Sequence, residues 1–241
     1  MMKSAIVCEG GTDQTLIQYY MEKVHQWNYL KASQKPFFTK VFKREESEIL
    51  EIVETGGVSK IAQGFQKLLD ITYKSISIQD QYQRIVLITD HDEASTISDF
   101  GGVLGGVLEK YSHCKVQLEN NCWTSVEFSN IIGEITKIDI LLLVIPFEEK
   151  GALETFLLNA VGEKNSYDKK IIDDCSNFVE NIDPDKNYLK KRRHITKAKF
   201  DVYFSIRTPM EQFKERRNIL RDVKWEEYVM IQETFQELEK L

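Results

Sequence analysis

Five carboxylates in this sequence have the type and the spacing that a metal site requires. Glu9 and Asp13 lie four residues apart around a Gly-Gly pair. Asp90 and Asp92 lie two residues apart, and Glu154 belongs to a third acidic stretch. Hard oxygen ligands of this kind suit Mg²⁺ or Mn²⁺, and a divalent cation would hold several carboxylates together against their mutual repulsion. The pattern therefore indicates metal-ion chemistry.

Short apolar runs precede these carboxylates and predict the strands that must position them. The runs cover residues 3–8, 84–89 and 138–145. Because they are nearly continuous in apolar residues, they are typical of parallel strands that are buried on both faces. The carboxyl ends of parallel strands meet at one edge of a sheet, where ligands bind. We therefore expect the five carboxylates to gather at that edge.

Helical patterns alternate with the apolar runs along the rest of the chain. Besides a further strand over 37–42, the sequence predicts helices over 12–24, 58–73, 95–111, 152–161, 167–182, 188–206 and from 210 to the end. This order predicts the α/β class, with a mostly parallel, Rossmann-like sheet sandwiched by helices. We expect residues 1–206 to form the catalytic α/β domain and residues 207–241 a C-terminal helical extension packed on it.

Each of these signals also has a simpler structural interpretation. An acid such as Asp13 is common at the start of a helix, where it caps backbone N–H groups. Asp90 and Asp92 could belong to an ordinary turn. The glycine pairs at 101–102 and 105–106 could cradle a phosphate, but without a following Lys-Ser/Thr they favour a turn or a closely packed helix. The combination of motifs, and not any single acid, points to function.

Two motifs together resemble the Toprim domain, the catalytic fold of topoisomerases, primases and OLD-type nucleases. Residues 5–13, Ala-Ile-Val-Cys-Glu-Gly-Gly-Thr-Asp, resemble its first motif, in which a Glu follows the first strand. Residues 86–92, Val-Leu-Ile-Thr-Asp-His-Asp, resemble its later strand-Asp-x-Asp motif. Pro146 with residues 151–154 is similar to a third element of small stand-alone relatives of the OLD-type group. The resemblance implies a Toprim-like fold.

The resemblance also implies a role for each matching residue. Glu9 would act as general acid/base or as a metal ligand, and Asp90 and Asp92 would bind Mg²⁺ and take part in catalysis. Asp13 and Glu154 would support a second metal ion. Two metal ions can stabilise the attacking and the leaving oxygens of phosphodiester cleavage. A lysine, Lys199 or its neighbour Lys197, would stabilise the charge that develops on phosphate.

The sequence departs from the family in ways that keep alternatives open. It has no G-x-x-x-x-G-K-[ST] motif, so the ATPase that accompanies OLD-type nucleases is not encoded in this chain. We expect a Mg²⁺-dependent nuclease, and we keep as the alternative a non-catalytic or partner-dependent Toprim-like module that needs a separately encoded ATPase. Phospho-acceptor receiver domains also carry acids at strand ends, but they are typically much shorter.

A basic segment offers a surface for nucleic acid. The chain has a net charge of −6, yet residues 186–224 contain 13 Lys or Arg and only 4 Asp or Glu. The residues that we expect to contact phosphates of DNA or RNA are Lys190, Lys191, Arg192, Arg193 and Lys197. The simpler interpretation is a solvated helix face paired with nearby acids.

Composition sets the remaining expectations. Apolar residues make up 42% of the chain and charged residues 29%, as in an ordinary globular protein. The longest apolar run, residues 140–145, is too short to cross a membrane. No secretory signal and no C-x-x-C pair is visible, so we expect a cytoplasmic protein with free thiols. A homodimer is compatible with this composition.

Overall fold

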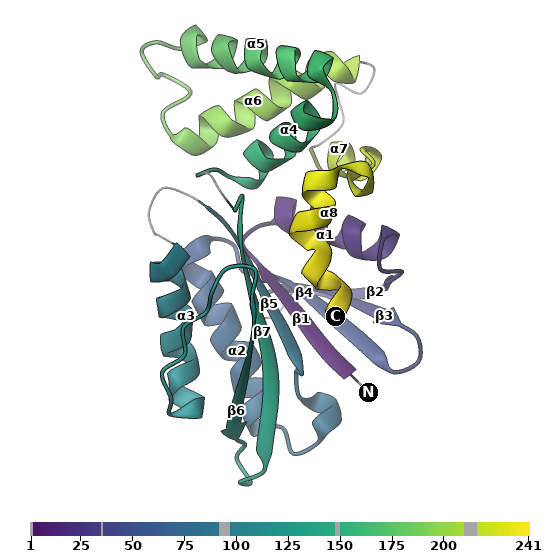
Figure 1. Cartoon of the computed structure of the whole chain (residues 1–241), viewed down its shortest axis with the longest axis vertical. Coiled ribbons are helices and arrows are strands. Elements are labelled where there is room, and N and C mark those ends of the chain that lie inside the picture. Colours follow the sequence, from purple (N-terminus) through teal and green to yellow (C-terminus); the bar gives the residue numbers. More distant parts are fainter. Residues whose placement is uncertain (1, 35, 92–96, 148–149, 210–215) are drawn as a thin grey trace.

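The structure is a computed structural model that describes residues 2–34, 36–91, 97–147, 150–209 and 216–241. Its described strands form one seven-stranded sheet in the order β2-β3-β4-β1-β5-β7-β6 (Figure 1). The strands are β1 (Met2–Cys8), β2 (Asn28–Ser33), β3 (Phe38–Arg44), β4 (Glu48–Glu54), β5 (Arg84–Asp90), β6 (Trp123–Ser129) and β7 (Ile135–Ile145).

The sheet is mixed, so the predicted mostly parallel sheet is correct only for its centre. Strands β4, β1, β5 and β7 run parallel to one another, whereas β2, β3 and β6 pair antiparallel at the edges. The short turns 45–47 and 130–134 force antiparallel pairing, because a parallel crossover needs a dozen or more residues. The sequence analysis missed β2, β4 and β6. All residues of β2 are exposed, β6 alternates between buried and exposed residues over most of its length, and glutamates interrupt the apolar residues of β4.

Helices cover both faces of the sheet, which confirms the predicted α/β class. The helices are α1 (Gly11–Lys23), α2 (Ile61–Lys74), α3 (Ile97–Ser112), α4 (Leu153–Lys164), α5 (Ser166–Ile182), α6 (Arg192–Arg207), α7 (Arg216–Asp222) and α8 (Val229–Phe235). Helices α2 and α3 pack with one face of the sheet in one hydrophobic cluster, and α1 packs with the other face in a second cluster. Among the described residues, no helix is long and apolar enough to cross a membrane.

The chain after β7 adds helices beyond the sheet. Helices α4, α5 and α6 pack on one another past the end of the sheet, and α8 lies beside α1 (Figure 1). The prediction of a single helix from residue 210 to the end is wrong, because the described part of this segment is divided into α7, α8 and short 3₁₀ turns. The end of the chain is anchored, since Leu241 is fully buried and the Arg84 guanidinium donates to the carbonyl oxygen of Lys240.

The glycine pairs at 101–102 and 105–106 lie inside α3, which confirms the helix predicted there. A Cβ atom at Gly105 would come 1.9 Å from the carbonyl oxygen of Val116, whereas a Cβ at Gly106 would meet nothing within 4 Å. Glycine at 105 therefore allows the segment after α3 to pack against the helix backbone.

This contrast predicts opposite effects of two neighbouring substitutions. We expect Gly105→Ala to lower the free energy of unfolding by about 1–3 kcal/mol, because the added methyl group overpacks a backbone contact. We expect Gly106→Ala to raise it by roughly 0.5–1 kcal/mol through the helix propensity of alanine. Urea denaturation of the two variants measures the difference, and equal stabilities would contradict the close packing.

Candidate functional site

The acids that follow β1 are held by backbone contacts at the carboxyl end of the parallel strands. Gly10 is the residue that caps the start of α1, and its N–H donates to Oδ2 of Asp13 over 2.7 Å. The carbonyl oxygen of Glu9 accepts from the N–H groups of Gly56 and Gly57, both at 2.9 Å. The Gly56 and Gly57 φ angles of 78° and 134° favour glycine, so the loop after β4 can clamp the backbone of Glu9.

A hydrogen bond connects Asp90, at the end of β5, to the start of the helix that follows β7. Asp90 is the last residue of β5, and its Oδ1 accepts from the N–H of Leu153 over 3.0 Å. Leu153 is the first residue of α4, so the carboxylate of Asp90 sits at the start of that helix, a favourable place for negative charge. The next residue, Glu154, is a buried charged residue, with 4% exposure.

His91 organises the backbone beside Asp90. Its N–H donates to the carbonyl oxygen of Ile145 over 2.7 Å, and its own carbonyl oxygen accepts from the N–H of Gly151 over 2.8 Å. Its Nδ1 lies 3.0 Å from the carbonyl oxygen of Pro146. The imidazole therefore joins the ends of β5 and β7, and these contacts set the position from which α4 begins.

Asp13, Asp90, Glu9 and Glu154 act on one another electrostatically. Burial of the carboxyl, together with the charges of Glu9 and Glu154, raises the pKa of Asp13 from 3.8 to about 7, against the lowering effect of the Gly10 hydrogen bond. Burial raises the pKa of Asp90 well above its ordinary value, and the charges of Asp13, Glu9 and Glu154 add to this effect. The four residues thus form one acid cluster, although Asp13 and Asp90 keep some exposure as whole residues.

A small cavity of about 10 Å³, room for about one water molecule, lies between Asp13 and Asp90. Apart from these carboxyls and Thr89 its lining is apolar, which explains the strong desolvation; the apolar residues are Leu16, Ile17, Ile88, Ile145, Leu153 and Phe235. The hydroxyl of Thr89 is buried and has no hydrogen-bond partner among the described residues.

The donor types in the acid cluster fit a divalent cation, but their positions are not those of a finished metal site. Within the described ranges, no three carboxylate, imidazole or thiol groups are placed so that they could hold a metal ion as they stand. Asp92, the second acid of the predicted Asp-x-Asp motif, lies outside the described residues. Carboxylates with raised pKa values nevertheless gain most from a bound cation, because it removes their mutual repulsion.

The two candidate lysines of α6 have different surroundings. The charge of Lys197 lowers the pKa of Asp13, which places this ammonium group within electrostatic reach of the acid cluster. Lys199 instead forms an ion pair with Glu180 of α5. The structure therefore connects Lys197, and not Lys199, to the acids.

The basic segment before and within α6 lies next to the loop that precedes α4. The Arg192 guanidinium donates to the carbonyl oxygen of Lys150 over 3.0 Å. Lys190, Lys191 and Arg193 are exposed, as is Lys197 one turn further along. The predicted phosphate-binding residues thus lie at the same end of the molecule as the acid cluster.

Comparison with known proteins decides the family. Residues 3–232 match the family described as "Protein of unknown function (DUF3226)". The chain belongs to the DUF3226 family. The crystal structure of hypothetical protein PH0156 from Pyrococcus horikoshii OT3 is similar to this DUF3226 protein, with a TM-score of 0.52 and 16% identity over 99% of this chain and 100% of that chain. At this identity the likeness concerns the fold alone. No curated protein matches the sequence significantly.

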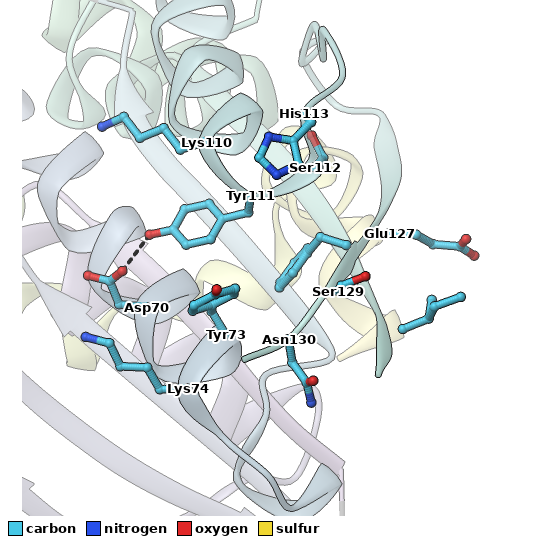
Figure 2. Close-up of a pocket in the computed structure, with 12 residues that line it drawn as sticks. Asp70, Tyr73, Lys74, Lys110, Tyr111, Ser112, His113, Glu127, Ser129 and Asn130 are labelled. Atoms are coloured by element: carbon cyan, nitrogen blue, oxygen red, sulfur yellow. Dashed lines mark hydrogen bonds between the residues drawn. The ribbon is translucent and has the colours of Figure 1, made fainter. Parts of the chain in front are cut away.

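A wide groove of the DUF3226 protein lies at the opposite end of the sheet from the acid cluster. It has a volume of about 730 Å³ between the ends of α2 and α3 and the strand β6. Figure 2 shows Tyr73 and Tyr111 lining it, with the Tyr111 hydroxyl donating to Asp70 over 2.7 Å. The side chain of Asn130 is engaged in its own turn, where it accepts from the N–H groups of Ile132 and Glu134. The groove therefore shows no cluster of reactive groups comparable to the acids.

Sequence reasoning missed three parts of the acid site. Thr89 and Phe235 line the small cavity, and Gly56 with Gly57 clamps Glu9. A Gly-Gly pair after an apolar run was a signal that could have located the loop after β4. Nothing in the sequence marks Phe235, because only the packing of α8 against α1 and α4 brings its ring beside Asp90.

Proposed function

We propose that this DUF3226 protein is a Toprim-like, Mg²⁺-dependent nuclease that cleaves phosphodiester bonds of DNA or RNA. The observation that carries the proposal is the acid cluster, in which Glu9, Asp13, Asp90 and Glu154 come from separate elements. Burial and the charges of the neighbouring acids raise the pKa values of Asp13 and Asp90. Such a cluster is unfavourable for a purely structural protein. It is favourable where a divalent cation is bound during function.

The order of the central strands supports the Toprim-like part of the proposal. A glutamate follows β1 and an aspartate ends the neighbouring parallel strand β5, at the carboxyl edge where α/β folds bind ligands. In this proposal residues 1–206 form the catalytic unit and residues 207–241 an extension packed on it. The extension contributes Phe235 to the wall behind Asp13 and Asp90.

Each part of the site has a role in this proposal. Asp90, Asp92, Asp13, Glu9 and Glu154 would hold Mg²⁺ or Mn²⁺. The bound cation would supply charge stabilisation to the phosphodiester oxygens. Lys197, whose charge acts on Asp13, would bind the phosphate that enters the site, and Glu9 would move a proton to or from the reacting oxygen. The run from Lys190 to Arg193 would hold the rest of the strand through its phosphates.

Removing the metal tests the function directly. We expect the purified protein to cleave plasmid DNA or single-stranded RNA in Mg²⁺ or Mn²⁺ and to lose cleavage completely in EDTA, with recovery when Mg²⁺ is added back. A parallel preparation of Glu9→Ala controls for contaminating nuclease. Cleavage that persists in EDTA, or that Glu9→Ala retains in full, would contradict the proposal.

A partner-dependent module is the second candidate function. It is favoured by one observation, since among the described residues the acids do not stand in a finished metal geometry. In such a module a separately encoded ATPase would complete the site. Mg²⁺ binding without cleavage, followed by cleavage when the ATPase captured from the native host is added, would select this alternative.

A further inference from the structure

Six exposed isoleucines gather at the end of the sheet opposite the acid cluster. They come from the end of α2, from the loop that follows it and from the β6–β7 turn, and they are 40–78% exposed: Ile71, Ile76, Ile78, Ile131, Ile132 and Ile135. We call this group the isoleucine patch. In Figure 1 the turn between β6 and β7 lies at the far end of the molecule from α4, α5 and α6. Exposed isoleucines at this density are uncommon on a monomer's surface.

Hydrogen bonds join the segments that carry the patch into one surface. The carbonyl oxygen of Ser75 accepts from Gln81 Nε2 over 3.0 Å and is approached by Asn130 Nδ2 at 3.5 Å. The N–H of Ile131 donates to the carbonyl oxygen of Tyr73 over 2.9 Å. The hydroxyl of Thr136 donates to Gln81 Oε1 over 3.3 Å. The isoleucines are therefore presented on a connected scaffold and not on separate loops.

We propose that the isoleucine patch is the interface through which a second copy of this chain binds. The six isoleucines are 40–78% exposed, and Ile135 extends their surface into the flanking groove, as an interface of roughly 800 Å² per partner requires. A centre rich in aliphatic residues is typical of homodimers, whereas transient interfaces are more polar.

The charges around the patch fit a two-fold arrangement of identical chains. Lys74, Asp80 and Glu134 are exposed at its border, so both signs are present. In a two-fold interface a residue away from the axis contacts a different residue of the other copy, and the same contact occurs twice, so Lys74 of each copy can face an acid of the other. The acid cluster stays open in this dimer because it lies at the other end of the parallel strands.

Analytical ultracentrifugation over roughly 1–100 µM full-length protein tests the proposal. We expect a dimer for the parent protein and at least about a tenfold weaker association for Ile76→Asp and for Ile132→Asp, which come from different segments of the patch. Ile182→Asp on α5 is the matched control, because the exposure of Ile182, 58%, lies between those of Ile76 and Ile132, and Ile182 lies away from the patch. We expect this control to associate like the parent.

Several outcomes would overturn the inference. They are a parent protein that stays monomeric over the whole range, a dimer that both patch variants leave intact, and a dimer that Ile182→Asp disrupts equally. Thermal melting of each variant shows that it is folded. If the two patch variants proved unfolded, Ile78→Ser at the 70% exposed Ile78 would replace them in the same measurement.

Discussion

Replacing Asp90 by asparagine is expected to lower Mg²⁺-dependent cleavage roughly 10²–10³-fold and, at the same time, to raise the melting temperature of the metal-free protein. Both effects have one cause. The carboxylate of Asp90 is desolvated and repelled by Asp13, Glu9 and Glu154, so its charge opposes folding until a cation is bound. Asparagine removes the charge and keeps an oxygen that can accept from the N–H of Leu153.

The sign of the stability change follows from proton binding. A carboxyl with a raised pKa holds its proton in the folded state at pH values where the unfolded chain has lost it. The free energy of unfolding of the parent protein therefore falls as pH rises from about 3.8 to the raised pKa of Asp90, and the variant lacks this fall. A gain of about 1 kcal/mol at neutral pH corresponds to about 2–4 °C in a chain of this size.

Calorimetry with and without Mg²⁺, together with the cleavage assay, measures both effects. Mg²⁺ should raise the melting temperature of the parent protein and leave that of Asp90→Asn nearly unchanged. Asp139→Asn is the matched control, because Asp139 lies on β7 beside Ser125 and away from the acid cluster. An Asp90→Asn variant that cleaves normally, or that melts below the parent without metal, would exclude Asp90 from the site.

The centre of the fold could be predicted from the sequence because its strands are buried on both faces. The runs 3–8, 84–89 and 138–145 are nearly continuous in apolar residues, and each lies within an observed strand with similar bounds. The edge strands β2 and β6 have no packed face or only one, so they lack the continuous apolar run that marks the central strands. The division of the C-terminal segment into short helices could not be predicted either, because a helical pattern does not show where α7 ends and α8 begins.

The gathering of Glu9, Asp13, Asp90 and Glu154 could be predicted from the sequence, but the contacts that hold these residues in place could not. Strand ends indicated where Glu9 and Asp90 would lie, because parallel strands deliver their carboxyl ends to one edge. The hydrogen bond between Asp90 and Leu153 depends on where α4 begins. The backbone contacts of His91 set that position, and the spacing of residues in the sequence does not indicate these contacts. Likewise Lys197 and Lys199 are equivalent as residue types, and only the turn of α6 directs one toward Asp13 and the other toward Glu180.

Lowering the pH from 8 to 6 is expected to weaken Mg²⁺ binding about tenfold, because the ligand carboxyl of Asp13, with a pKa of about 7, must lose its proton to bind a cation. Lys197→Gln is expected to move the midpoint of this profile to higher pH, since the lysine charge lowers the pKa of Asp13. Lys199→Gln should leave the midpoint in place, because Lys199 pairs with Glu180.

Isothermal titration with MgCl₂ at pH 6, 7 and 8 gives the three profiles without any need for cleavage. The comparison separates a general loss of positive charge from a specific one, because each variant removes one lysine from the same helix. A midpoint that moves equally in both variants would show that α6 acts on the acids only through its net charge. A midpoint that moves in Lys197→Gln alone would show that this ammonium group, and not the net charge of α6, acts on Asp13.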